Sequence, residues 1–343
     1  MLQMTRKHTE QHDEDRSPVD EDLPTTLPAF VKRFPDEGAC LDYLFWLRFP
    51  EGFECPKCGT DDGHWMDSRP GVIACKKGHQ TSLTAGTALH GTRTDITTWF
   101  YAAYLVSTLT PGVSALQLQK QLGITRYETA YQILQKLRAS LVDPDRTKLT
   151  GYVEVDECFV GGAGHGAGRG TTNPMVVVAV EVVDYTDKKG KPARRAGRVR
   201  MEVVPNAKEG TLVGWVAEHV DRGATVATDG FTSYRTLPEY GYNHVVVFQQ
   251  KDGEATGEFM PMVHLIISNF KRWLLGTYKG AVRPQHLPAY LNEFVFRFNR
   301  RFWRGPAFAR ALGLAVSERQ HPTYDDIYGV RKGEAWMHPN PEE

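Results

Sequence analysis

The sequence predicts an α/β protein in which a catalytic domain with a mixed β-sheet follows a small metal-binding module and a helical segment. Three observations support this prediction. Cysteines gather between residues 55 and 75, apolar residues repeat at helical spacing between residues 96 and 141, and short apolar or alternating stretches recur between residues 151 and 248. These patterns are typical of a metal clip, of helices and of strands, respectively.

Length and composition favour a soluble protein of two or three domains. The chain has 343 residues, of which 41% are hydrophobic, and acidic and basic residues balance at 41 each. The longest apolar run, residues 175–183, is interrupted by Glu181 and is far shorter than the roughly 20 residues that cross a bilayer. No targeting segment is recognised at the N-terminus. We therefore expect a cytoplasmic protein that contacts no membrane.

Changes in composition along the chain suggest five parts. The first 24 residues are rich in charge and lack hydrophobic periodicity, which is typical of a disordered tail. The expected parts are the tail 1–24, a zinc-ribbon domain with an N-terminal helix at 25–92, a helix-turn-helix segment at 93–145, a catalytic domain at 146–316 and a C-terminal tail at 317–343.

Two pairs of soft ligands predict a zinc site. Cys55 and Cys58 form a C-x2-C pair, and after 16 further residues Cys75 and His79 form a C-x3-H pair. Four such ligands suit tetrahedral Zn²⁺ and leave no open coordination position, so this zinc should be structural. His64 is a weaker candidate ligand, because it stands alone in a polar stretch.

Two helices separated by a short turn with glycine indicate a DNA-binding helix-turn-helix. Leu116, Leu118 and Leu122 precede a short Gly-Ile-Thr turn. The apolar residues after the turn repeat at helical spacing, and they are Tyr127, Ala130, Tyr131, Ile133, Leu134 and Leu137. A recognition helix presents its first turn to base edges, although a plain helical hairpin would show the same pattern. The candidate DNA contacts are Thr125, Arg126, Tyr127 and Thr129.

The order of elements after residue 146 indicates a ribonuclease-H-like mixed sheet. We expect three strands, a helix at 207–220, a fourth strand, a helix, a fifth strand and a final helix. In that fold the first and fourth strands are neighbours. The expected strands are residues 151–160, 173–185, 197–206, 223–228 and 243–248.

Two carboxylates should meet at the ends of the first and fourth strands. Asp156 lies on the first strand and Asp229 directly follows the fourth. Paired oxygen ligands on adjacent strands bind Mg²⁺ or Mn²⁺, which support phosphoryl transfer. Glu154 and Glu157 are alternatives to Asp156: Glu154 shares its face of the strand, whereas Glu157 points to the other face and is expected to form a salt bridge outside the sheet. Asp229 could otherwise simply begin an Asp-Gly turn.

The combined motifs resemble a known family. The motifs are CPKCG, GHQTSLTAGT, WFYAAYL, VEVDECFVGG, TDGFTSY, NFKRWLLGTYKG and YLNEFVFRFNRR, spread between about Phe34 and Val316. They are similar to those of the ISXO-like insertion-sequence transposases of the DDE superfamily, which carry a zinc ribbon. The resemblance implies an enzyme that nicks the ends of its own element, joins them to target DNA, and acts as a dimer or larger assembly on double-stranded DNA. Its first two acidic residues match Asp156 and Asp229.

The third acidic residue of the family is missing. The resemblance implies a glutamate about 35 residues after Asp229 and a basic residue seven positions later, and these places hold His264 and Lys271. Histidine can bind Mn²⁺ but suits Mg²⁺ less well than a carboxylate does. Asn269 is a rival for the third position. Lys271 is expected to bind a DNA phosphate. The alternative function is a catalytically inactive or domesticated sequence-specific DNA-binding protein.

Basic residues cluster in two stretches that could follow DNA. Residues 188–200 hold seven basic and no acidic side chains, and residues 279–310 hold seven basic side chains against Glu293 alone. The aromatic residues of the second stretch are expected in the core. The glycine-rich residues 161–170 lack the spacing of a nucleotide-binding loop, and no phosphate role is expected for them.

Overall fold

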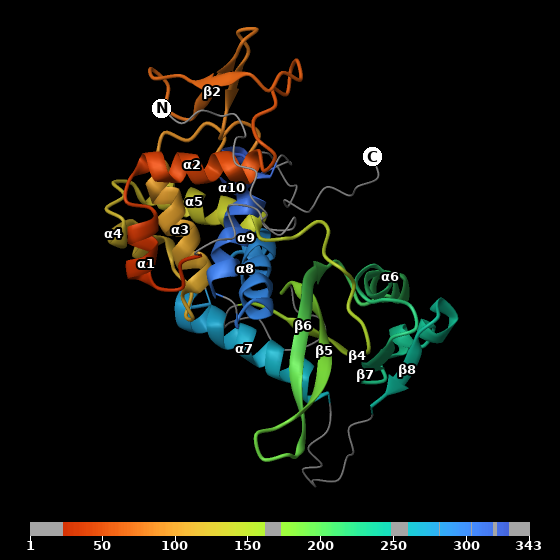
Figure 1. Cartoon of the computed structure of the whole chain (residues 1–343). Helices are drawn as coiled ribbons and strands as arrows, with labels where there is room; N and C mark the ends of the chain where they lie inside the picture. The colour runs from red at the N-terminus through yellow and green to blue at the C-terminus, as the bar shows by residue number, and fades with distance from the viewer. Residues whose placement is uncertain are drawn as a thin grey trace. The chain divides into compact units, whose positions relative to one another are not determined.

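The computed structural model describes residues 23–161, 173–247, 260–280, 282–302, 304–317 and 321–328 (Figure 1). These residues form two compact units. One runs up to Val142 and includes the segment from Arg300 onward, and the other runs from Asp143 to Asn299. The first unit thus contains a C-terminal helix that we had expected in a continuous catalytic domain 146–316. Most of the expected N-terminal tail, residues 162–170 of the glycine-rich stretch and most of the C-terminal tail lie outside the described residues.

The first unit begins with two helices and a three-stranded antiparallel sheet. Pro35 separates the two helices, and the Asp36 side chain caps the second by accepting a hydrogen bond from Ala39 N at 2.9 Å. The sequence had suggested one helix here. The elements are α1 (Leu27–Arg33), α2 (Glu37–Arg48), β1 (Gly63–Trp65), β2 (Val72–Cys75) and β3 (Gln80–Ser82), with the strands in the order β1-β2-β3.

Five further helices complete this unit around an aromatic core. Phe308 of the C-terminal segment is fully buried, and its ring contacts those of Phe30, Phe34 and Phe100. These contacts explain why residues after 300 join the N-terminal unit. The helices are α3 (Ile96–Thr108), α4 (Ala115–Gln121), α5 (Tyr127–Ser140), α9 (Arg304–Val316) and α10 (Tyr324–Tyr328).

The second unit contains a mixed five-stranded sheet of the ribonuclease-H-like type. Figure 1 shows its strands in the order β6-β5-β4-β7-β8. β4 and β6 each pair antiparallel with β5, whereas β4 pairs parallel with β7, and β7 with β8. The first and fourth strands of this sheet are therefore neighbours. The strands are β4 (Tyr152–Phe159), β5 (Met175–Thr186), β6 (Pro192–Val204), β7 (Thr225–Thr228) and β8 (Asn243–Val246).

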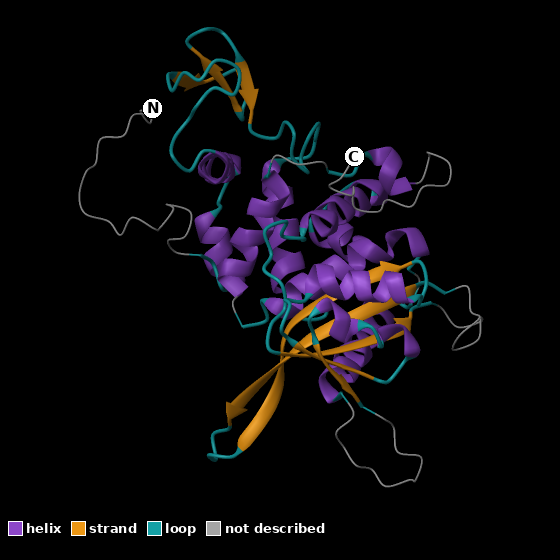
Figure 2. Ribbon diagram, turned by 90° about the vertical axis from the view of Figure 1, so that its right-hand side faces the viewer, coloured by secondary structure: helices purple, strands orange, loops and turns teal. Residues whose placement is uncertain are grey.

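Helices cover both faces of this sheet (Figure 2). Val153 and Val155 of β4 pack on the face covered by α6 (Glu209–His219), and Cys158 packs on the face covered by α7 (Pro261–Tyr278) and α8 (Leu287–Asn299). The helix expected between the fourth and fifth strands is instead a pair of 3-10 turns. These turns are η1 (Thr232–Tyr234) and η2 (Leu237–Tyr240), and a third, η3 (Pro284–His286), precedes α8.

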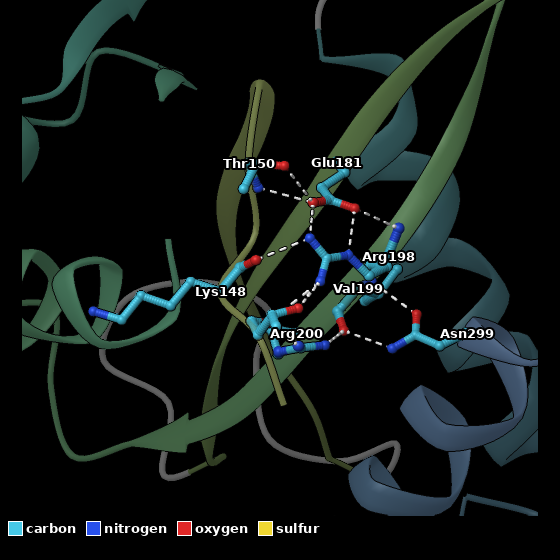
Figure 3. A network of polar contacts seen from close by, with 8 residues as sticks. Lys148, Thr150, Glu181, Arg198, Val199, Arg200 and Asn299 are labelled. Atoms are coloured by element: carbon cyan, nitrogen blue, oxygen red, sulfur yellow. Dashed lines mark hydrogen bonds and ion pairs between the residues drawn. The ribbon is translucent and has the colours of Figure 1, made fainter. Parts of the chain in front are cut away.

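A polar network fastens the segment that leads into β4 (Figure 3). Arg198 of β6 donates to both oxygens of Glu181 on β5, to Thr147 Oγ1 at 2.6 Å and to the Lys148 carbonyl at 2.9 Å. Thr150 N donates to Glu181 Oε1 at 2.8 Å. The buried carboxylate is therefore paired and hydrogen-bonded, as a charge out of water must be.

The same part of β6 also holds the end of α8. The Asn299 side chain accepts from Val199 N at 2.8 Å and donates to Val199 O at 3.1 Å, and Arg200 donates to the Thr147 carbonyl at 2.8 Å (Figure 3). Arg198, Val199 and Arg200 thus bind both the segment by which the chain enters this unit and the residue at which it leaves, Asn299.

Candidate active site and zinc centre

The four expected zinc ligands lie together. Cys55 Sγ is 3.8 Å from His79 Nδ1, and Cys58 Sγ is 3.8 Å from Cys75 Sγ. All four ligand atoms lie within 4.8 Å of one another. A tetrahedral site with Zn–S bonds of about 2.3 Å has S–S edges of about 3.8 Å, so the donor set and its spacing fit structural Zn²⁺.

Two backbone turns build this site. Cys55 O accepts from Cys58 N and Gly59 N at 3.2 and 2.9 Å, and Cys75 O accepts from Gly78 N at 2.8 Å. Burial alone would raise the pKa of the Cys55 thiol, but hydrogen bonds from the Lys57 and Cys58 backbone and from neighbouring side chains lower it to about 6. This favours the thiolate that zinc requires.

His64 does not join the zinc cluster. It lies on β1 opposite Ala74 of β2, and its side chain is exposed. This position agrees with the sequence analysis, in which His64 was only a weak candidate for a zinc ligand.

The parallel pairing of β4 with β7 brings Asp156 towards Asp229. The register pairs Val153 with Val226 and Glu154 with Ala227. This register directs Asp156 towards Asp229, which follows the last residue of β7, and adjacent strands lie about 4.8 Å apart. Burial raises the pKa of Asp156, and the Asp229 charge raises it further. Two carboxylates that repel each other in this way favour a cation between them.

His264 of α7 contacts Asp156. Its Nδ1 lies 3.4 Å from Asp156 Oδ2, and its side chain remains 47% exposed. The nearby charges of His264 and Lys271 oppose the rise in the Asp156 pKa. Among the described residues, the ligand atoms of Cys55, Cys58, Cys75 and His79 all lie within 4.8 Å of one another. Asp156, Asp229 and His264 are not packed into such a cluster.

Helical geometry separates the two candidates for the third position. A helix turns about 100° per residue, so Lys271 lies within about 20° of His264, whereas Asn269 lies about 140° away. Lys271 is exposed on the side of α7 that faces β4, and its charge acts on Asp156 and Cys158. The partly buried Asn269 lies on the other flank, nearer Met262 and Trp273.

Glu154 does not share the position of Asp156. Its Oε2 accepts hydrogen bonds from Met262 N and Val263 N, both at 2.8 Å, and its side chain is buried. Burial raises the pKa of Glu154, and these two amides partly oppose that rise. One of the two carboxylates on this face of β4 therefore points at the start of α7, and the other at His264.

The prediction that Glu157 forms a salt bridge outside the sheet is wrong. Burial raises the pKa of Glu157 to about 7; the nearby Tyr234 hydroxyl opposes the rise, and the charges of Asp156 and Asp229 add to it. Within the described residues, Glu157 Oε1 and the fully buried Tyr234 hydroxyl make no hydrogen bond of regular geometry. Sequence reasoning missed Tyr234, although it follows Asp229 by only five residues.

The predicted helix-turn-helix is present as α4 and α5. Ser114 caps α4 by accepting from Gln117 N at 3.2 Å, and Gly123, at φ 63°, makes the left-handed turn that ends it. The candidate DNA contacts lie at the start of α5. Thr125, Arg126 and Tyr127 are exposed there, and Thr129 is half-buried.

The basic stretch 188–200 has two roles. Its first residues form the tip of the β5–β6 hairpin, which extends beyond the rest of the sheet (Figure 2). Arg198 and Arg200, in contrast, belong to the internal network described above. Treating the whole stretch as a DNA-facing surface was therefore wrong.

The second basic stretch is also divided. Arg297 lies 3.3 Å from the fully buried Glu293 within α8. Phe294 and Phe296 are buried, as expected of core residues, but Phe302 is 63% exposed beneath the Arg301 guanidinium.

The part of the chain that the structure describes contains no helix with the length and hydropathy of a membrane span.

Two family models match the chain. Residues 148–299 match the ISXO2-like transposase domain, and residues 35–81 match the transposase zinc-ribbon domain. The first match contains Asp156, Asp229, His264 and Lys271, and the second contains the four zinc ligands. The comparison with curated proteins gives no match.

Proposed function

Because the chain belongs to the ISXO2-like DDE transposases and carries their zinc ribbon, we propose that it binds the terminal repeats of its own insertion sequence and catalyses metal-dependent cleavage and strand transfer. The observation that carries this proposal is that Asp156 of β4 lies against His264 and close to Asp229, which directly follows β7. A dimer or larger assembly on DNA follows from the need to hold two element ends together.

The catalytic donor set fits a divalent cation. Asp156 and Asp229 offer hard oxygen ligands whose mutual repulsion a cation relieves, and His264 adds a nitrogen. When bound, Mg²⁺ or Mn²⁺ would activate the attacking oxygen and stabilise the leaving one in phosphoryl transfer. A histidine in this set favours Mn²⁺ more than a third carboxylate would.

Local hydrogen bonds orient the two carboxylates. Asp156 Oδ1 accepts from Glu157 N at 2.8 Å, which turns Oδ2 towards His264, and Asp229 Oδ1 accepts from Phe231 N at 3.0 Å. Each aspartate thus has one oxygen held by the backbone amide of a residue one or two positions later, so less ordering is needed when substrate binds. Lys271, about 10 Å further along α7, would hold a phosphate of the DNA and fix the strand against the carboxylates.

The first unit would supply end recognition. In this proposal the exposed residues Thr125, Arg126 and Tyr127 at the start of α5, together with the half-buried Thr129, contact base edges or phosphates. The zinc ribbon is a second, metal-stabilised module that could contact the same DNA. Two such modules on one chain suit an enzyme that must find a specific end before cutting.

A second function is favoured by one observation. His264 stands where the family usually has a carboxylate, so the chain could be an inactive or domesticated DNA-binding descendant of a transposase. DNA taken from both sides of the gene, labelled at the 3′ ends, tests this directly. Binding of both flanks without cleavage in Mg²⁺ or Mn²⁺ would support the inactive protein, and cleavage followed by joining supports the transposase.

Substitutions then identify the residues responsible. Asp156→Asn and Asp229→Asn should each abolish cleavage and joining but leave end binding intact, because they remove charge and keep the side-chain shape. His264→Ala should lower activity most in Mg²⁺, and His264→Glu should retain or raise it. Asn269→Ala is the matched control on the opposite flank of α7. Loss of activity in that variant alone would move the third position to Asn269.

A further inference from the structure

We propose that Glu154 is a positioning residue that holds the start of α7 against β4 and thereby sets His264 against Asp156. This inference rests on the proposed function, since His264 and Asp156 are the residues assigned to metal binding there. Glu154 would touch neither metal nor DNA and would act through the helix.

The start of α7 lacks a cap of its own. The residue before it, Met260, has a left-handed backbone at φ 41° and makes no side-chain cap, and Pro261 has no amide hydrogen. The amides of Met262 and Val263 have no acceptor within the helix, as is general for a first turn. Glu154 Oε2 accepts from both at 2.8 Å. The cap therefore comes from a strand 108 residues earlier in the chain.

The negative charge of Glu154 also suits this place. The start of a helix carries a partial positive charge, which a carboxylate stabilises, and charge-assisted bonds are stronger than neutral ones. The side chain is only 3% exposed, so water is a poor substitute for it. Its loss would leave the partly buried Met262 amide and the buried Val263 amide unpaired.

The cap lies next to the catalytic contact. Glu154 and Asp156 point to the same face of β4, two residues apart, and the capped amides immediately precede His264. Two contacts thus join this strand to this helix: Glu154 with the first turn, and Asp156 with His264 at 3.4 Å. Removing the first leaves the position of His264 to apolar packing of residues such as Val263 and Ile266.

Conservative variants separate positioning from metal binding. Glu154→Gln keeps an acceptor oxygen at the same reach but removes the charge, whereas Glu154→Asp keeps the charge and shortens the side chain by one methylene. If Glu154 were a metal ligand, Glu154→Gln should lose as much activity as Asp156→Asn does. If Glu154 instead caps α7, Glu154→Gln should retain more activity than Glu154→Asp or Glu154→Ala.

The first measurement is hydrogen exchange of the Met262 and Val263 amides in the full-length protein. We expect protection in wild type and Glu154→Gln, and loss of protection in Glu154→Ala and Glu154→Asp. Unchanged protection in the Ala and Asp variants would overturn the proposal. If the Ala variant does not fold, the comparison of Asp with Gln decides the same question. This readout needs no activity, so wild-type protein that cuts no DNA would refute only the proposed function.

The second measurement is a double-mutant cycle on the cleavage rate at saturating DNA. Residues that hold a metal ligand in place typically contribute 10- to 100-fold to activity, so Glu154→Ala should cost about that much in the wild-type background. In a His264→Ala background the same change should cost little, because the residue being positioned is gone. An equal loss in both backgrounds would overturn the proposal, as would Glu154→Gln as inactive as Asp156→Asn.

Discussion

Replacing Glu157 with glutamine should stabilise the protein above neutral pH, in buffers without added Mg²⁺ or Mn²⁺. Burial, opposed in part by Tyr234 and assisted by Asp156 and Asp229, raises the pKa of this carboxyl from 4.5 to about 7. The folded protein therefore keeps a proton that the unfolded chain releases between these pH values. Wild-type stability is complete below pH 4.5 and falls as the pH rises to 7, and glutamine avoids that loss.

The size of the effect follows from the shift. Each pH unit in this window costs about 1.4 kcal/mol, so the rise from 4.5 to about 7 corresponds to a difference of about 3 kcal/mol above pH 7. Urea denaturation from pH 4 to 8 measures it, with the zinc site left loaded. Glu239→Gln, at an exposed position on η2, is the control and should run parallel to wild type. A constant difference between wild type and Glu157→Gln across this range would refute the reasoning.

Three further predictions concern zinc, DNA and acid stability. Cys58→Ser should lose the roughly one zinc per chain expected of a closed four-ligand site, together with end binding; metal analysis of native protein that finds no zinc would contradict this. Lys271→Ala should reduce the slope of log K against log salt by about 0.9, the value for one phosphate contact, whereas Arg198→Ala should lower the melting temperature and leave the slope unchanged, because Arg198 is bound to Glu181. Burial lowers the pKa of His219 from 6.5 to about 3, so stability is full above pH 6.5 and falls with acid, by about 3 kcal/mol at pH 4.5; His219→Gln should remove this loss, and unchanged acid sensitivity in that variant would be evidence against it.

Local patterns were sufficient for the zinc cluster and for most strands. Cys55 and Cys58, like Cys75 and His79, are each joined by one backbone turn, so their spacing alone determines that each pair can share an ion. The alternation in β4 likewise determined which residues share a face, because successive strand residues point to opposite sides. The adjacency of β4 and β7 was predictable only through the order of elements typical of the fold.

Partners distant in sequence were decided by the tertiary structure alone. Glu154 and Asp156 are equivalent in the strand pattern, and only the docking of α7 assigns one to the Met262 and Val263 amides and the other to His264. In the same way, burial of Phe308 assigned α9 to the first unit. A charged or aromatic side chain takes its role from the groups that replace its water on folding, and hydrophobic periodicity contains no information about those groups.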